Sequence, residues 1–221
     1  MRKPLRLVRA ASAEFDGRFF ERDPRFGTIA PAAAPFVEYT RWPEPAELDR
    51  ALAARAGVRF VPARRRPRRH RGPVNLGEMY DAHIIRGEVP TREKNWHDFL
   101  NALVWATFPR AKKALHARQH RALQAWARTG ELASGDTVRK LPNARTRELD
   151  ALALVDEGGL LVCDDARLVF GHALYEGFVF EVPAMIARGV ILRGRAADAD
   201  ALLAERLAEP LTPDVLPREP Q

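Results

Sequence analysis

The chain has 221 residues, 46% of them hydrophobic, which allows one domain with a substantial core and excludes disorder throughout. No apolar run approaches the length of a membrane span, and the N-terminus has no apolar segment of signal-peptide length. The one cysteine, Cys163, excludes an internal disulfide and fits a reducing compartment, so we expect a cytoplasmic protein.

The net charge is +7 and the pI about 10.1, which raises the question of a polyanionic partner. One cluster of arginines stands out in a Pro-containing stretch: Arg64, Arg65, Arg66, Arg68, Arg69 and Arg71. Such a run is typical of an anion-binding segment, but equally of a solvated linker. It contains no aromatic residue on which a base would stack. The excess of arginine over lysine is also what GC-rich codon usage produces, so both interpretations stay open.

The first third of the chain predicts an arm followed by a regular domain. Residues 1–43 are interrupted by prolines and glycines and read as an irregular arm, anchored on the core by Phe15, Phe19, Phe20, Phe26 and Phe36. A single globular domain is expected over residues 44–208, with a loose tail at 209–221. It begins with a helix from Glu44 to Gly57, a strand from Val58 to Pro62 and, after the arginine-rich loop, a helical turn from Met79 to Gly87.

Two consecutive helices form the centre of the predicted fold. The first runs from about Asn95 to Thr107, with Thr91 or Asn95 as its N-cap, and is apolar around most of its circumference. Pro109 ends it and starts the second helix, which extends to about Thr129.

The last third predicts loops, a hairpin and two shorter helices. Residues 131–147 read as loop. Two strands, Ala151–Val155 and Leu160–Cys163, are expected to form an antiparallel hairpin around an Asp-Glu-Gly-Gly turn. Helices follow near Gly171–Glu176 and Asp198–Ala208. The predicted fold class is therefore α+β, predominantly α-helical, with a small antiparallel β-hairpin.

Several polar side chains lie within otherwise apolar helices, where burial is costly unless they are paired or used. They form three groups of candidate site residues: His97 with Asp98 and Asn101, His116 with His120, and His172 with Glu176. The last two pairs have i, i+4 spacing, which lets both side chains reach one metal ion or one another. Asp150, at the start of a predicted strand, is a further candidate. Each group also has a structural interpretation, as a core hydrogen-bond network or a solvated helix face.

The run GEVPTREKNWHDFLNALVWATFPRAKKAL resembles the signature of a bacterial family known only as domain of unknown function 3025. The segments RELDALALVDEGG and FGHALYE resemble two further blocks of that family. The resemblance implies no activity. It does point to the positions that match the blocks: Trp96, His97, Asp98, Asn101, Trp105, Pro109, Arg110, Asp156, Glu157, His172 and Glu176.

Three hypotheses about function follow. The first is a hydrolase-like enzyme that uses a divalent metal ion or acid–base chemistry, with catalytic residues His97, Asp98, Asn101, Asp150, His172 and Glu176 and metal ligands among His97, His116, His120 and His172. The second is a protein that binds nucleic acid or another anion through Arg64, Arg65, Arg66, Arg68, Arg69 and Arg110. The third is a structural or partner-binding domain in which these polar groups form an internal network.

Overall fold

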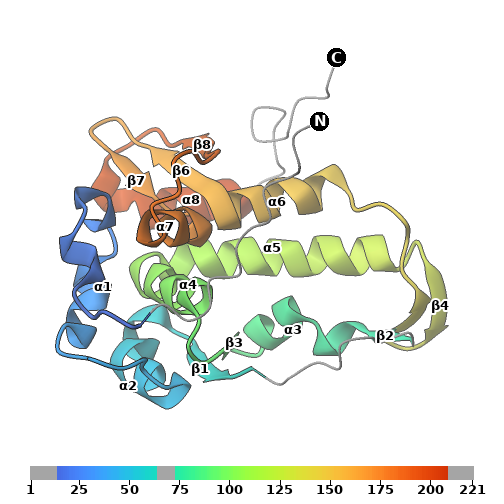
Figure 1. The fold of residues 1–221 in the computed structure, drawn as a ribbon. Coiled ribbons are helices and arrows are strands. Elements are labelled where there is room, and N and C mark those ends of the chain that lie inside the picture. Colours follow the sequence, from blue (N-terminus) through green and yellow to red (C-terminus); the bar gives the residue numbers. More distant parts are fainter. Residues whose placement is uncertain (1–13, 64–72, 209–221) are drawn as a thin grey trace, which may run out of the picture.

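The computed structural model describes residues 14–63 and 73–208 (Figure 1). Its α-helices are α1 (Ala30–Ala33), α2 (Pro45–Ala56), α3 (Tyr80–Ile85), α4 (Trp96–Thr107), α5 (Pro109–Ala127), α6 (Arg147–Gly158), α7 (His172–Val179) and α8 (Ala199–Ala208). Its strands are β1 (Arg59–Pro62), β2 (Val74–Asn75), β3 (Glu88–Thr91), β4 (Glu131–Ser134), β5 (Thr137–Lys140), β6 (Gly159–Val162), β7 (Arg167–Val169) and β8 (Arg188–Ile191). The predominantly helical α+β class is confirmed. No helix in this part of the chain has the length and apolar character needed to cross a bilayer.

Helices α4 and α5 begin where their capping residues predict. The side-chain oxygen of Asn95 accepts a hydrogen bond from the amide of Asp98 at 3.0 Å, which caps α4. Pro109 takes the first position of α5, where a missing amide hydrogen has no intrahelical partner to lose. Helix α4 is buried because α1, α2 and α7 all pack against it. Helix α5 runs through the middle of the molecule, with α6 and α8 on one side and α3 on the other (Figure 1).

The aromatic residues of the N-terminal arm belong to the main hydrophobic core. Phe15, Phe19, Phe26 and Phe36 are buried there, and Phe20 packs against it, as the sequence predicted. The ring of Phe19 lies 5.2 Å from that of Trp96, so the arm covers the N-terminal end of α4. The domain boundaries themselves stay a prediction, and the segments at 64–72 and 209–221 lie outside the described residues.

Three small sheets connect the helices. Strands β1 and β3 pair in parallel, and β2, β5 and β4 form an antiparallel sheet. In the third sheet β6 lies at the centre, antiparallel to β7 and parallel to β8. The short helix α7 follows β7 directly, and this connection brings the start of α7 back to the end of α6.

The predicted strand Ala151–Val155 is wrong, because these residues form the middle of helix α6. Thr146 caps this helix by accepting from the amide of Leu149 at 3.2 Å, and acidic residues follow in its first turn. The alternating apolar residues that suggested a strand also fit the inner face of a helix. The second predicted strand is confirmed in β6, but its hairpin partner is β7.

Residues 131–147, predicted as loop, also contain an unpredicted hairpin. Strands β4 and β5 pair around a turn in which Gly135 has a φ of 53°, a conformation that glycine adopts without strain. The strands are short and polar, so they lack the apolar alternation on which the prediction of strands depends.

Candidate functional site

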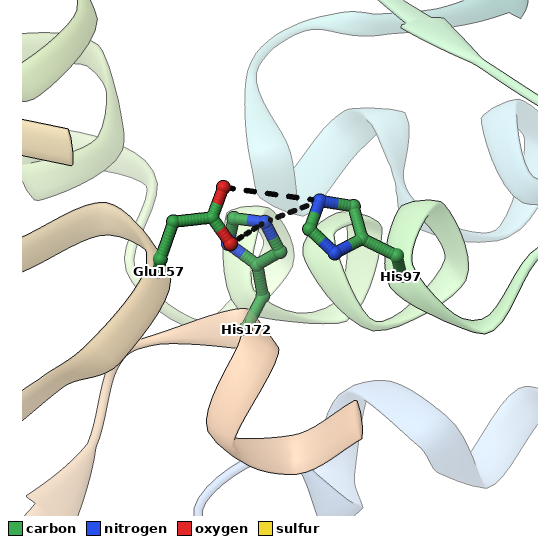
Figure 2. Close-up of side chains that lie close together, drawn as sticks. All are labelled: His97, Glu157 and His172. Atoms are coloured by element: carbon green, nitrogen blue, oxygen red, sulfur yellow. Dashed lines mark hydrogen bonds and ion pairs between the residues drawn. The ribbon is translucent and has the colours of Figure 1, made fainter. Parts of the chain in front are cut away.

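Three side chains from three different helices converge at one point. His97 lies in the first turn of α4, Glu157 in the last turn of α6, and His172 is the first residue of α7 (Figure 2). The Nε2 atoms of the two imidazoles are 3.0 Å apart. The carboxylate of Glu157 lies 3.4 Å from Nε2 of His172 and 4.0 Å from Nε2 of His97. Among the described residues, this is the group of three possible ligands close enough to hold one metal ion.

Two glycines allow α6 and α7 to approach closely enough for this convergence. The amide of Gly171 donates to the carbonyl of Gly159 at 2.9 Å, which holds the start of α7 against the end of α6. A Cβ atom on Gly171 would overlap with the carbonyl oxygen of Glu157 and the backbone of Gly159. A glycine at position 171 therefore places His172 next to Glu157.

The second nitrogen of each imidazole is held by a hydrogen-bond acceptor. Nδ1 of His172 lies 2.9 Å from the backbone carbonyl of Asp156, and Nδ1 of His97 lies 3.0 Å from Oε2 of Glu176. Because a carbonyl and a carboxylate oxygen accept, both Nδ1 atoms carry the hydrogen. In the neutral tautomers this leaves a lone pair on each Nε2, directed at the other ring. This is the arrangement by which outer acceptors orient metal-binding histidines.

The electrostatic surroundings act differently on the two histidines. Burial lowers the pKa of His172 to about 3, so that its imidazole is neutral near pH 7. Burial also acts to lower the pKa of His97, but the hydrogen bond to Glu176 and the charge of Glu157 outweigh it and raise this pKa above its ordinary value. Burial raises the pKa of the Glu157 carboxyl, although the nearby His97 acts in the opposite direction. The surroundings therefore favour a proton on the imidazole of His97 over one on that of His172.

One side of the cluster faces solvent. The side chain of His172 is 3% exposed, whereas those of His97 and Glu157 are 29% and 49% exposed. The cluster thus combines a buried imidazole with two side chains at an open surface, where a further molecule has room to approach.

A buried ion pair lies directly behind the cluster. Nζ of Lys112, on α5, donates to the carboxylate of Asp156 and, at 2.8 Å, to Oδ1 of Asn101. Burial acts to raise the pKa of Asp156, but the positive charge of Lys112 outweighs burial and holds this pKa well below its usual range. The same Asp156 offers its backbone carbonyl to His172, so the ion pair fixes the backbone that carries the site.

Of the predicted catalytic residues, the structure brings His97, His172 and Glu176 together but not the others. Asp98 accepts from the backbone amide and the guanidinium of Arg92, and therefore holds the turn before α4. Asn101 belongs to the buried network around Lys112. Asp150 is exposed at the opposite end of α6, about 10 Å along the helix from Glu157, and pairs with Arg145.

The histidine pair on α5 does not join the cluster. Nδ1 of His116 lies 2.9 Å from the carboxylate of Asp81, and its buried ring stacks on Trp105. Nε2 of His120 lies 2.9 Å from the amide of Gln124. Neither is part of a three-ligand group in the described parts of the chain, so we leave both out of the proposed site.

The predicted anion-binding residues do not form one group in the described part of the chain. Arg64, Arg65, Arg66, Arg68 and Arg69 lie outside the described residues. Arg110 is exposed in the first turn of α5, where its backbone amide donates to Asp200 at 3.2 Å. We therefore draw no site from these arginines.

Glu157 was not among the predicted site residues. Its position in an Asp-Glu-Gly-Gly run suggested a turn, and only the family resemblance pointed to it. A helix over residues 147–158 places Asp156 and Glu157 in its last turn, but the contact of Glu157 with His97 depends on how α4 and α6 both pack against α7.

The family model described as "Protein of unknown function (DUF3025)" matches residues 59–168, and this part of the chain therefore belongs to that family. The match includes His97 and Glu157 and ends before His172, so the assignment of the FGHALYE block to the family stays a prediction. Comparison with the curated proteins and with the solved structures found no matching chain.

Proposed function

We propose that the protein is a metal-dependent hydrolase that binds one divalent cation through Nε2 of His97, Nε2 of His172 and the carboxylate of Glu157. One observation supports this most strongly. The two Nε2 atoms face each other at 3.0 Å while both Nδ1 hydrogens are engaged elsewhere. Two nitrogen lone pairs at this distance repel each other unless a proton or a cation lies between them.

The kind of ligand fits a catalytic ion better than a structural one. Two imidazoles and one carboxylate are the protein ligands of many catalytic zinc sites and of non-haem iron sites. Structural zinc sites are closed by four protein ligands, usually with thiolates. Here there are three candidate ligands, two of them partly exposed, and the lone Cys163 is not part of the group.

The surrounding residues would hold the ligands in place. Glu176 orients the ring of His97, and the Asp156 carbonyl orients that of His172, so each Nε2 is aimed at the same point. A divalent ion held by these residues would supply Lewis acidity and would lower the pKa of a bound water to about 7, as hydrolysis at neutral pH requires. The open side at Glu157 would admit the substrate.

Metal analysis of the full-length protein without a histidine tag tests this proposal. We expect one equivalent of zinc by titration, and cobalt(II) bound at the same site with an absorption spectrum typical of nitrogen and oxygen ligands. His97→Ala and Glu157→Gln should each weaken metal binding at least about a hundredfold. A screen of ester, amide and phosphoester substrates with and without metal then identifies the reaction.

His120→Ala is the matched control, because it removes an imidazole from the same protein outside the cluster. It should bind metal like the wild type. The proposal is overturned if the folded wild-type protein binds no metal. It is also overturned if His120→Ala loses as much metal affinity as His97→Ala. The polar cluster would then be an internal network that stabilises the fold.

A further inference from the structure

A cavity of about 270 Å³ opens beside Glu157. It lies between the last turn of α6, the first turns of α7 and the segment that leads into β8. Its lining is Leu154, Glu157, Gly158, Ala173, Leu174, Met185, Ile186, Ala187 and Arg188. Since Glu157 is one of the three ligands of the proposed metal site, the cavity begins where that site is open to solvent.

The walls of this cavity are apolar although they face solvent. Two residues of the lining, Ile186 and Leu154, are 97% and 42% exposed. These are two of the few large apolar side chains that are exposed in the described parts of the chain. Exposed apolar side chains gathered at one hollow are typical of a surface that binds an apolar group.

The wall formed by residues 182–187 is held by a close contact with α7. Met185 packs directly on Gly177, where a Cβ atom would overlap with its sulfur. The amide of Val182 also donates to the carbonyl of Gly177 at 2.9 Å. The apolar rim is therefore part of the folded structure and stands at a defined distance from Glu157.

The remaining polar residue of the lining, Arg188, makes no ion pair with Glu157 or with any other described carboxylate. It is half-buried as the first residue of β8, next to Gly159 of β6. Within residues 14–63 and 73–208, its guanidinium has neither a hydrogen bond nor an ion pair. A partly buried arginine without a partner is poorly solvated and favours an anionic ligand, which it binds through two parallel hydrogen bonds.

We infer that the cavity binds the substrate, and that the substrate is an amphiphilic anion: an apolar chain of fatty-acyl character that carries a carboxylate or similar negative group. The chain would lie on Leu154, Leu174 and Ile186, and the anion would pair with Arg188. The bond to be hydrolysed would then lie next to Glu157. This inference rests on the proposed function for its chemistry, but the contacts that would bind the ligand are Arg188 and the apolar wall, which are not metal ligands.

Calorimetric titration of the full-length protein with octanoate and with 1-octanol separates the two parts of this ligand. Both probes offer the same chain, and only octanoate offers the anion. Arg188→Met should weaken octanoate binding about tenfold and leave octanol binding unchanged. Arg193→Met is the control, because it removes an exposed arginine just after the end of β8. It should change the affinity for neither probe. Ile186→Ser should weaken both probes equally, with no effect on folding because the side chain is exposed.

The titrations are performed on both zinc-loaded and chelated protein, which separates this inference from the proposed function. If the wild type binds no zinc but Arg188→Met selectively loses octanoate, the ligand class stands and the metal site fails. If octanoate does not bind, or binds to Arg188→Met as tightly as to the wild type in both preparations, the inference is overturned whatever the zinc result.

Discussion

Lys112 and Asp156, 44 residues apart, form an ion pair in which the lysine side chain is completely buried. The pair joins α5 to the last turn of α6, and the carbonyl of Asp156 holds His172. A buried ion pair is weak evidence for high stability, because both charges lose their hydration. Its geometry is nevertheless what keeps the backbone around Glu157 in position, so the fold and the candidate site depend on the same contact.

Removal of the lysine should therefore destabilise the protein strongly. Lys112→Ala leaves the Asp156 carboxylate buried and without its cation, and we expect a loss of about 3–5 kcal/mol in the free energy of unfolding, measured with urea. Lys113→Ala, at the exposed neighbouring position, should change it by less than about 0.5 kcal/mol. Lys112→Met combined with Asp156→Asn should recover part of the loss. A loss below about 1 kcal/mol in Lys112→Ala would contradict this account.

Metal binding should weaken as the pH falls. The pKa of His97 is raised above its ordinary value of 6.5, so its proton competes with the metal from a higher pH than in a free imidazole. Apparent zinc affinity should be constant at high pH and decrease as the pH falls through the pKa of His97. The pKa itself is measured by NMR titration of the chelated protein.

Glu176→Gln supplies the control for this pH dependence. The variant removes the hydrogen-bonded carboxylate that raises the pKa of His97, so the midpoint of the pH profile should move to lower pH. At high pH its zinc affinity should be about 10–100-fold weaker, because the imidazole is less well oriented. An unchanged midpoint would show that Glu176 does not act on His97.

Gly171→Ala should damage both the fold and the site. The added methyl group would overlap with the backbone at Glu157 and Gly159, so α7 must shift away from α6. We expect a loss of about 1–3 kcal/mol in stability and at least a tenfold loss of zinc affinity. Gly189→Ala is the matched control, since a Cβ atom there meets nothing within 4 Å. Normal zinc binding by Gly171→Ala would show that the approach of these helices does not set the ligand geometry.

The N-terminal arm should contribute to stability like the rest of the core. Phe19 is buried and contacts the rings of Phe26, Trp96 and Phe99. Phe19→Ala should lower the free energy of unfolding by about 3–5 kcal/mol. Phe20→Ala should cost clearly less, because Phe20 is only partly buried. Similar small losses in both variants would indicate that the arm detaches before the rest of the protein unfolds.

Local sequence signals predict most of the helices and two of the three side chains in the cluster, His97 and His172. Helices with clear caps and a continuous apolar face, such as α4 after Asn95 and α5 from Pro109, were predicted nearly to the residue, because these signals are local. The spacing of His172 and Glu176 likewise identified two residues that lie beside His97.

The packing of the helices determines which polar residues meet. Asp98 and Asn101 lie in the same motif as His97, but on helix α4 their side chains contact Arg92 and Lys112 instead. Glu157 joins His97 across 60 residues of chain because α6 is a helix and Gly171 lets α7 start against its end. Such contacts depend on how helices pack, and an apolar pattern of five residues fits a strand or a buried helix equally well.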